Sequence, residues 1–260
     1  MEILTNFDNL VPSEPIKFIT KDGYDRTEID KVVAGLKETM EANPEMVALA
    51  APAIGMNTRA FCIRFNNTVK TFINPVITKK SGVKVILETC DLLPGKEIVI
   101  GRPEEITVVY YTDELKYEEN KLLGTAAAIF DQQEQLLNGI LPSELGLVSD
   151  IETDGAITEE DWPAVFEFYT KTFLPAKLEA VKELIGTDEE SAKAYKELAF
   201  TEGVINGRIK VVESEAETSA RGKAKKAAAK SLRIAGMQAA HQQRAEFKSY
   251  VNKVSKKKKH

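Results

Sequence analysis

A predicted helix near residues 123–138 places side chains at spacings that could support chemistry. Residues four apart lie on one helix face, so two suitable ligands at that spacing can hold one metal ion. One pair of positions with this spacing on the predicted helix is occupied by Gln132 and Leu136. A glutamine amide is a poor ligand for zinc or iron(II), and a leucine is none. Gln133 cannot take up a proton as a carboxylate base can. The two histidines of the chain lie far downstream, at His241 and His260.

Three segments, in a fixed order and spacing, carry the clearest family signal in the chain. They read V-A-L-A-A-P-A-I-G at 47–55, E-T-C-D-L at 88–92 and K-L-L-G-T-A-A-A-I-F-D-Q-Q-E-Q-L-L-N-G-I-L at 121–141. They resemble the three motifs of peptide deformylases, and the similarity spans about residues 10–150. The resemblance implies an α+β fold in which mixed antiparallel sheets surround a central helix.

The resemblance also assigns family roles to five positions. Gln132 and Leu136 stand where the family has its metal-binding histidines, and Gln133 stands where it has the catalytic glutamate. Ala53 replaces a glutamine that helps to hold the formyl oxygen, and Cys90 is the one metal ligand retained. One ligand does not make a metal site. We therefore predict a pseudoenzyme without metal or other cofactor, in which Leu136 fills the former metal pocket.

An alternative interpretation keeps a metal-dependent deformylase with different ligands. The candidate set is Cys90, Asp91, Asp131 and Glu134. Asp131 and Glu134 are three apart and can share a helix face. They are offset from the family's metal positions, however, and an exposed acidic helix face explains them more simply.

The pattern of apolar residues predicts the elements around this helix. An apolar stripe from Ile29 to Met40 predicts a helix that begins near Thr27 and ends before Asn43-Pro44. Cys62 lies in an alternating run and is expected in the core. Predicted strands lie at 60–65, 69–77, 83–88, 97–100 and 105–111.

Beyond about residue 157 the pattern becomes helical, which predicts two parts of the chain. We expect a peptide-deformylase-like domain at 1–155 and an all-helical extension with a basic tail at 156–260. Pro175 should kink or break the first helix of the extension. The aromatic row from Trp162 to Phe173 is predicted to pack as core, with a partner-binding face as the alternative.

Charge is unevenly distributed along the chain. Residues 203–260 hold 15 Lys and Arg against 4 Asp and Glu, a net charge of +11, whereas the remainder holds 20 against 36, a net charge of −16. A basic tail of this kind predicts an acidic partner. Aromatic residues do not interleave the basic clusters as stacking platforms for bases would require. The predicted basic interaction patch consists of Arg221, Lys223, Lys225, Lys226, Lys230 and Arg233.

These observations lead to one main functional hypothesis and one further alternative. The main hypothesis is a structural or assembly component with protein partners or copies of itself, for example in a bacteriophage particle. The alternative is a nucleic-acid or ribosome-associated binding module that acts through residues 203–260. The two cysteines and the absence of a leader or a long apolar run predict a cytoplasmic protein, or a virion protein if phage-encoded, with no membrane contact.

Overall fold

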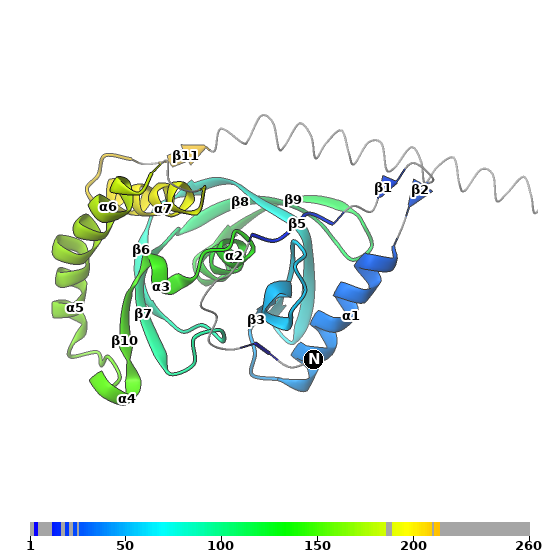
Figure 1. Cartoon of the computed structure of the whole chain (residues 1–260), viewed down its shortest axis with the longest axis horizontal. Coiled ribbons are helices and arrows are strands. Elements are labelled where there is room, and N and C mark those ends of the chain that lie inside the picture. The colour runs from blue at the N-terminus through cyan, green and yellow to red at the C-terminus, as the bar shows by residue number, and fades with distance from the viewer. Residues whose placement is uncertain are drawn as a thin grey trace, which may run out of the picture.

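Two antiparallel sheets face each other across one central helix in the computed structural model of the chain (Figure 1). The structure describes residues 3–4, 12–16, 19–20, 23–24, 26–185, 189–209 and 211–213. Helix α2 (Thr125–Leu137) is the central helix. The predicted α+β class is therefore confirmed, as is the central helix that the third motif indicated.

The larger sheet has the strand order β3-β4-β5-β8-β9, with the short strand β11 paired to β5. Strand β5 is long and carries register shifts, which let it bend and pair with β4 at one end and β8 at the other. A separate pair, β1 with β2, lies outside this sheet. The strands are β1 (Ile19–Thr20), β2 (Gly23–Tyr24), β3 (Ala48–Ala50), β4 (Ala60–Phe65), β5 (Thr68–Ser81), β8 (Glu105–Tyr111), β9 (Tyr117–Leu123) and β11 (Val211–Glu213).

The smaller sheet has the order β10-β7-β6, so β6 forms one of its edges. Its strands are β6 (Lys84–Glu88), β7 (Lys96–Arg102) and β10 (Leu147–Asp150). Strand β3 forms an edge of the larger sheet in the same way. Within the described residues, β6 and β10 are the two edge strands of the smaller sheet, and β3 and β9 are those of the larger one.

Helix α1 (Thr27–Ala42) covers the larger sheet, and α2 fills the space between the sheets. The apolar stripe of α1 is buried as its spacing predicted. Phe130 of α2 meets Phe61 and Phe72 edge to face, with ring centroids 4.9 and 5.2 Å apart. Such contacts add to the burial of the rings themselves, so α2 is fixed to the larger sheet by an aromatic cluster. Cys62 lies fully buried in the same core, as predicted.

Six strands were not predicted from the sequence, namely β1, β2, β3, β9, β10 and β11. Strand β9 reads Y-E-E-N-K-L-L, a polar run whose side chains lie largely exposed at the sheet edge. Strands β3 and β10 are short and lack an alternating pattern. Their extended conformation depends on pairing with β4, β7 and β8, which a local pattern cannot show.

Most of the described residues between Trp162 and Ile205 are helical, as expected. It comprises α5 (Trp162–Phe168), the π-helical turn η2 (Tyr169–Phe173), α6 (Leu174–Glu183) and α7 (Glu189–Ile205). The remaining short helices are η1 (Ala51–Ile54), α3 (Pro142–Leu145) and α4 (Ile151–Asp154). The predicted interruption at Pro175 takes the form of the wide turn η2 directly before it, because proline has no N–H to continue the α-helical ladder.

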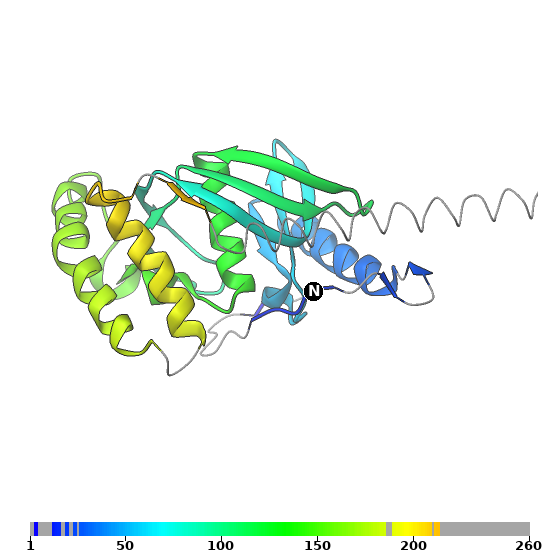
Figure 2. The same ribbon diagram turned by 90° about the horizontal axis from the view of Figure 1, so that it is seen from above.

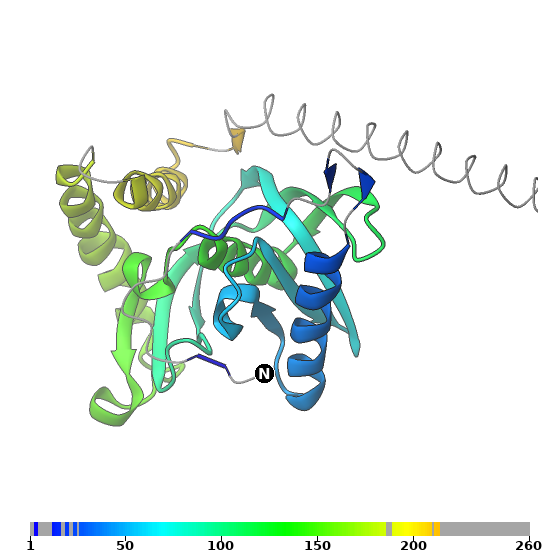
Figure 3. The same ribbon diagram turned by 45° about the vertical axis from the view of Figure 1, so that its right-hand side comes forward.

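The helical extension packs on the smaller sheet and lies on the opposite side of the molecule from α1 (Figure 2 and Figure 3). Tyr169, Leu174 and Leu198 join Ile98 and Ile100 in a second hydrophobic core. The aromatic row is thus core in part, as predicted. Two of its residues, Phe166 and Phe168, remain exposed. The division between residues 155 and 156 stays a prediction. No described helix is long and apolar enough to cross a membrane.

The contact between α7 and β7 depends on Gly101. Its N–H donates to the Tyr169 hydroxyl at 2.9 Å. A Cβ at this position would overlap the methyl group of Thr201 in α7 and approach Val83 Cγ1 at 3.1 Å. The extension can therefore approach the sheet closely only because residue 101 has no side chain.

Gly101→Ala is expected to lower the free energy of unfolding by about 1–3 kcal/mol, because overpacking forces a stiff, β-branched side chain to move. The measurement is urea unfolding followed by circular dichroism. Adding Thr201→Ser removes the overlapping methyl and should restore part of the lost stability. Equal stability of Gly101→Ala and the wild type would contradict the close contact.

Candidate ligand-binding site

A cavity of about 700 Å³ lies between the two sheets and is lined along one side by α2. This is within the usual range for small-molecule sites. All five family positions lie in its wall. The residues that line the cavity include Glu45, Ala48, Ala50, Ala53, Lys84, Leu87, Glu88, Thr89, Cys90, Asp91, Arg102, Glu104, Gln132, Gln133 and Leu136.

The cavity corrects our expectation that the former metal pocket is filled. Leu136 is buried and belongs to the wall, but it does not close the space. Small side chains also line the cavity, namely Ala48 and Ala50 of β3 and Ala53 of η1. The expectation of a filled pocket considered the volume added at Leu136 and not the volume missing at these alanines.

The free edges of β3 and β6 both border the cavity. The Val47 carbonyl accepts from Arg64 N–H at 2.7 Å, so residue 47 points its backbone toward β4. Backbone groups of successive residues in a strand point to alternate sides. Ala48 and Ala50 therefore direct their N–H and C=O groups away from β4, toward the cavity.

The same alternation orients β6. The Gly101 N–H of β7 points to Tyr169, away from β6. The backbone groups that bond to β6 are therefore those of its neighbours Ile100 and Arg102, which pair with Ile86 and Lys84. Because the direction alternates, the backbone N–H and C=O of Leu87 lie on the open side of β6. The Thr89 carbonyl, two residues on, accepts from Gln132 in α2, as this alternation requires.

Gln132 and Gln133 form a short hydrogen-bonded chain at the α2 wall. Gln133 Nε2 donates to Gln132 Oε1 at 3.2 Å, and Gln132 Nε2 donates to the Thr89 carbonyl at 3.0 Å. Gln133 Oε1 is buried and has no hydrogen-bond partner. A buried polar atom without a partner is uncommon and calls for an explanation.

Cys90 lies in the wall as a protonated thiol. Burial raises the pKa of Cys90 to about 11, although the backbone N–H of Leu92 donates to the sulfur and opposes this rise. Burial also raises the pKa of the neighbouring Asp91. Both cysteines are free, and Cys90 is the one that borders the cavity.

The donor set does not fit the metal ion that the family resemblance implies. Zinc and iron(II) sites use imidazole, thiolate or carboxylate groups. The three family positions offer the buried thiol of Cys90, the amide of Gln132 and the hydrocarbon of Leu136. Among the described residues, no group of three or more His, Cys, Asp and Glu side chains is arranged to hold a metal ion. We derive no chemical step through a metal.

A neighbouring face of α2 is fixed by a buried ion-pair network around Arg102. Its guanidinium contacts Glu88 of β6 at 2.5 and 2.9 Å and Asp131 of α2 at 2.8 Å. Burial opposes the charge on Arg102, but the Glu88 carboxylate outweighs this effect and raises the pKa of Arg102. Gln135 accepts a further bond from Arg102 at 2.6 Å.

The network extends into the helical extension through Lys80. This ammonium group contacts Asp131 at 2.7 Å and Glu197 of α7 at 2.6 Å. Gln135 Nε2 also donates to Glu197, at 3.1 Å. Burial would raise the pKa of Asp131, but Lys80 and Arg102 outweigh burial and lower it. The carboxylate of Asp131 thus connects both sheets, α2 and α7.

This network corrects the expectation that Asp131 and Glu134 form an exposed acidic face. Asp131 is fully buried, and Glu134 bonds to Arg59 at 2.6 Å and to Asn138 at 2.7 Å. Burial raises the pKa of Glu134. Neither residue lines the cavity, whereas Cys90 and Asp91 do. The structure does not bring the alternative ligand set together, because α2 turns the two acids toward its packed face.

The comparisons with known proteins agree with this architecture. A family model described as polypeptide deformylase matches residues 8–145. The peptide deformylase of Thermotoga maritima is 32% identical over 120 residues, which cover 44% of this chain and 73% of that protein. The peptide deformylase of Karelsulcia muelleri is 33% identical over 101 residues, covering 36% of this chain and 53% of its own length.

The crystal structure of a probable peptide deformylase from synechococcus phage S-SSM7 is similar with a TM-score of 0.49 and 27% identity, covering 55% of this chain and 97% of that one. The family match extends over more than half of the chain. The chain belongs to the peptide deformylase family.

Family membership corrects our prediction that the chain is not an enzyme. The relatives that match it are named peptide deformylases, which are enzymes, and the match covers the residues that build the cavity. The prediction relied on the side chains at Ala53, Gln132, Gln133 and Leu136 and gave too little weight to the rest of the matched fold. The predicted basic patch, from Arg221 to Arg233, lies outside the described residues.

Arg102→Met is expected to lower the free energy of unfolding by about 3–5 kcal/mol, because it leaves the buried Glu88 carboxylate without its partner and Asp131 with Lys80 alone. The measurement is urea unfolding at neutral pH. Lys171→Met is the matched control, since Lys171 pairs with Glu167 on the exposed surface and should change stability by at most about 0.5 kcal/mol. Similar changes in the free energy of unfolding for the two substitutions would contradict the proposed contribution of the network to stability.

Cys90 should react slowly with iodoacetamide at pH 8 in the native protein. With a pKa of about 11, its thiolate fraction is roughly 100-fold below that of an ordinary exposed cysteine. Peptide mass spectrometry would follow the modification of each thiol. Cys62, whose pKa is also about 11 and which lies away from the cavity, should react more slowly still. In urea both should react rapidly, and fast native modification of Cys90 would disprove the raised pKa.

Proposed function

We propose that the chain binds the amino-terminal part of an extended peptide in the cavity between β3 and β6. The observation that carries this proposal is the pair of free strand edges that border one cavity. An extended peptide can add to such an edge through main-chain hydrogen bonds, while pockets receive its alternate side chains. Ala48 and Ala50 on one side and Leu87 on the other offer these bonds.

The composition of the wall supports the same ligand class. Small alanine side chains on β3 and η1 leave room for a peptide side chain at the inner end, beside Leu136. The family is named for an activity on peptides, and its model matches the residues that form the cavity. Peptide binding is thus supported by both the strand edges and the family to which the chain belongs.

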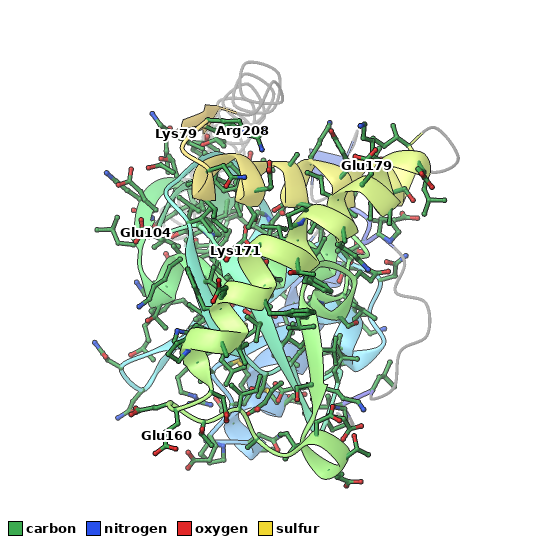
Figure 4. All side chains as sticks on the ribbon, turned by 90° about the vertical axis from the view of Figure 1, so that its left-hand side faces the viewer. Lys79, Glu104, Glu160, Lys171, Glu179 and Arg208 are labelled. Carbon is green, nitrogen blue, oxygen red and sulfur yellow. The ribbon has the colours of Figure 1, made fainter. Side chains whose placement is uncertain are left out.

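The predicted role in an assembly with protein partners remains a proposal for the helical extension. Phe166 and Phe168 of α5 are exposed aromatic residues, and exposed aromatic residues are common at protein interfaces. Figure 4 shows the outer face of the extension, with Lys171 and Glu179 on its surface. This placement supports a protein partner, whose identity a pull-down of the intact chain would give.

Leu87→Pro is expected to weaken peptide binding about 2- to 10-fold, because proline removes one main-chain donor on the open side of β6. The measurement is isothermal titration calorimetry with a methionine-led tripeptide. An edge strand tolerates proline where the N–H faces away from the ladder, so the fold should persist. Leu87→Ala is the matched control, because it shortens the same side chain and keeps the N–H. Equal affinities of the two variants, or no binding by the wild type, would refute the proposal.

A further inference from the structure

We propose that two copies of the chain pair through the free edge of β9, in an antiparallel register that sets Glu119 of one copy opposite Lys121 of the other. Strand β9 ends the larger sheet, and within the described residues no strand pairs with its outer side (Figure 2). A strand of a second chain can extend such an edge through main-chain hydrogen bonds. The inference does not depend on the proposed peptide binding.

The pairing of β9 with β8 shows which residues face the free edge. The Gly124 N–H, directly after β9, donates to the Glu104 carbonyl, directly before β8, at 2.8 Å. Backbone direction alternates along a strand, so the even-numbered residues of β9 bond to β8. The register between the two strands continues without a shift. The residues that present N–H and C=O to the free edge are the odd-numbered Tyr117, Glu119, Lys121 and Leu123.

One two-fold register sets unlike charges opposite each other along this edge. Antiparallel pairing about Asn120 places Glu119 opposite Lys121 of the second copy, and the two-fold axis repeats the pair. It also places Tyr117 opposite Leu123, whose side chain is 60% exposed in a single copy. Moving the axis to residue 119 or 121 would set two like charges opposite each other, which is destabilising. The charges therefore select the register.

The neighbouring side chains leave these charges available to a second copy. Tyr110 Oη donates to Glu118 at 2.7 Å, and Asn120 Nδ2 donates to Tyr110 Oη at 2.8 Å, so both even-numbered side chains turn back to β8. The Lys121 side chain contacts Glu105 of β8 at 2.7 Å and stays 58% exposed. Charged side chains on an edge oppose random strand pairing. An alternating glutamate and lysine oppose every register except the complementary one.

Sedimentation velocity of the full chain over a range of concentrations tests the pairing. A seven-residue edge forms a small interface, so we expect a dissociation constant in the micromolar range or weaker. Glu119→Lys and Lys121→Glu should each weaken dimerisation about 10-fold or more, because each sets like charges opposite each other twice. Glu167→Lys is the matched control, since it makes the same charge change on the exposed face of α5. It should leave the dissociation constant unchanged.

Mixing the two charge variants separates pairing from a defect in folding. One partner then carries two positive charges at these positions of its edge, and the other carries two negative charges. The mixture of Glu119→Lys with Lys121→Glu should therefore recover a dimer that neither variant forms alone. Urea unfolding of each variant confirms that it is folded.

Cysteine crosslinking tests the register directly. Asn120 lies opposite itself in a pair without main-chain hydrogen bonds, where Cα atoms are about 4.5 Å apart, within the range of a disulfide. The two copies of position 118 are roughly 13 Å apart along the strands. Asn120→Cys should therefore form a covalent dimer under dissolved oxygen, and Glu118→Cys should not, as seen by non-reducing electrophoresis. The native cysteines are buried and should not compete.

Each remaining outcome overturns a stated part of the proposal. A wild-type chain that stays monomeric at every concentration would overturn the dimer. Dimers that persist in both charge variants, or a mixture that stays monomeric, would overturn the β9 edge as the interface. Crosslinking of Glu118→Cys in place of Asn120→Cys would overturn the register.

Discussion

The buried guanidinium of Arg102 is the interaction on which the rest of the structure depends. It joins Glu88 of β6 to Asp131 of α2 from its own position at the end of β7. A buried charge is tolerated only when its partners compensate for the loss of water, and here two carboxylates and an amide do so. Because these partners belong to different elements, the pairing fixes the smaller sheet relative to the central helix.

The central helix consequently has two faces with different tasks. Asp131 and Gln135 face the ion-pair network, where Lys80 and Glu197 connect them to the larger sheet and to the helical extension. Gln132, Gln133 and Leu136 face the cavity. A change in how α7 packs would therefore act on the same helix that forms the cavity wall.

Much of the fold could be predicted from the sequence, because strands such as β4 and β8 carry their own alternating pattern. Strand β9 could not, since its polar residues become extended only through pairing with β8. The site was predicted as a set of positions, through the order and spacing of the three motifs. Its openness was not, because that depends on small residues, Ala48, Ala50 and Ala53, that line the same cavity as Leu136 and lie far from it in the chain.

The sequence by itself determined the family, the α+β class and the residue types available at the site. Residue types follow directly from the chain, and the motifs preserve order and spacing. The tertiary structure decided which side of α2 each side chain faces, that Asp131 and Glu134 are buried, and that Gln133 keeps an unmatched acceptor. These properties depend on contacts between segments distant in sequence, such as Thr89 with Gln132 and Lys80 with Glu197, so no local pattern contains them.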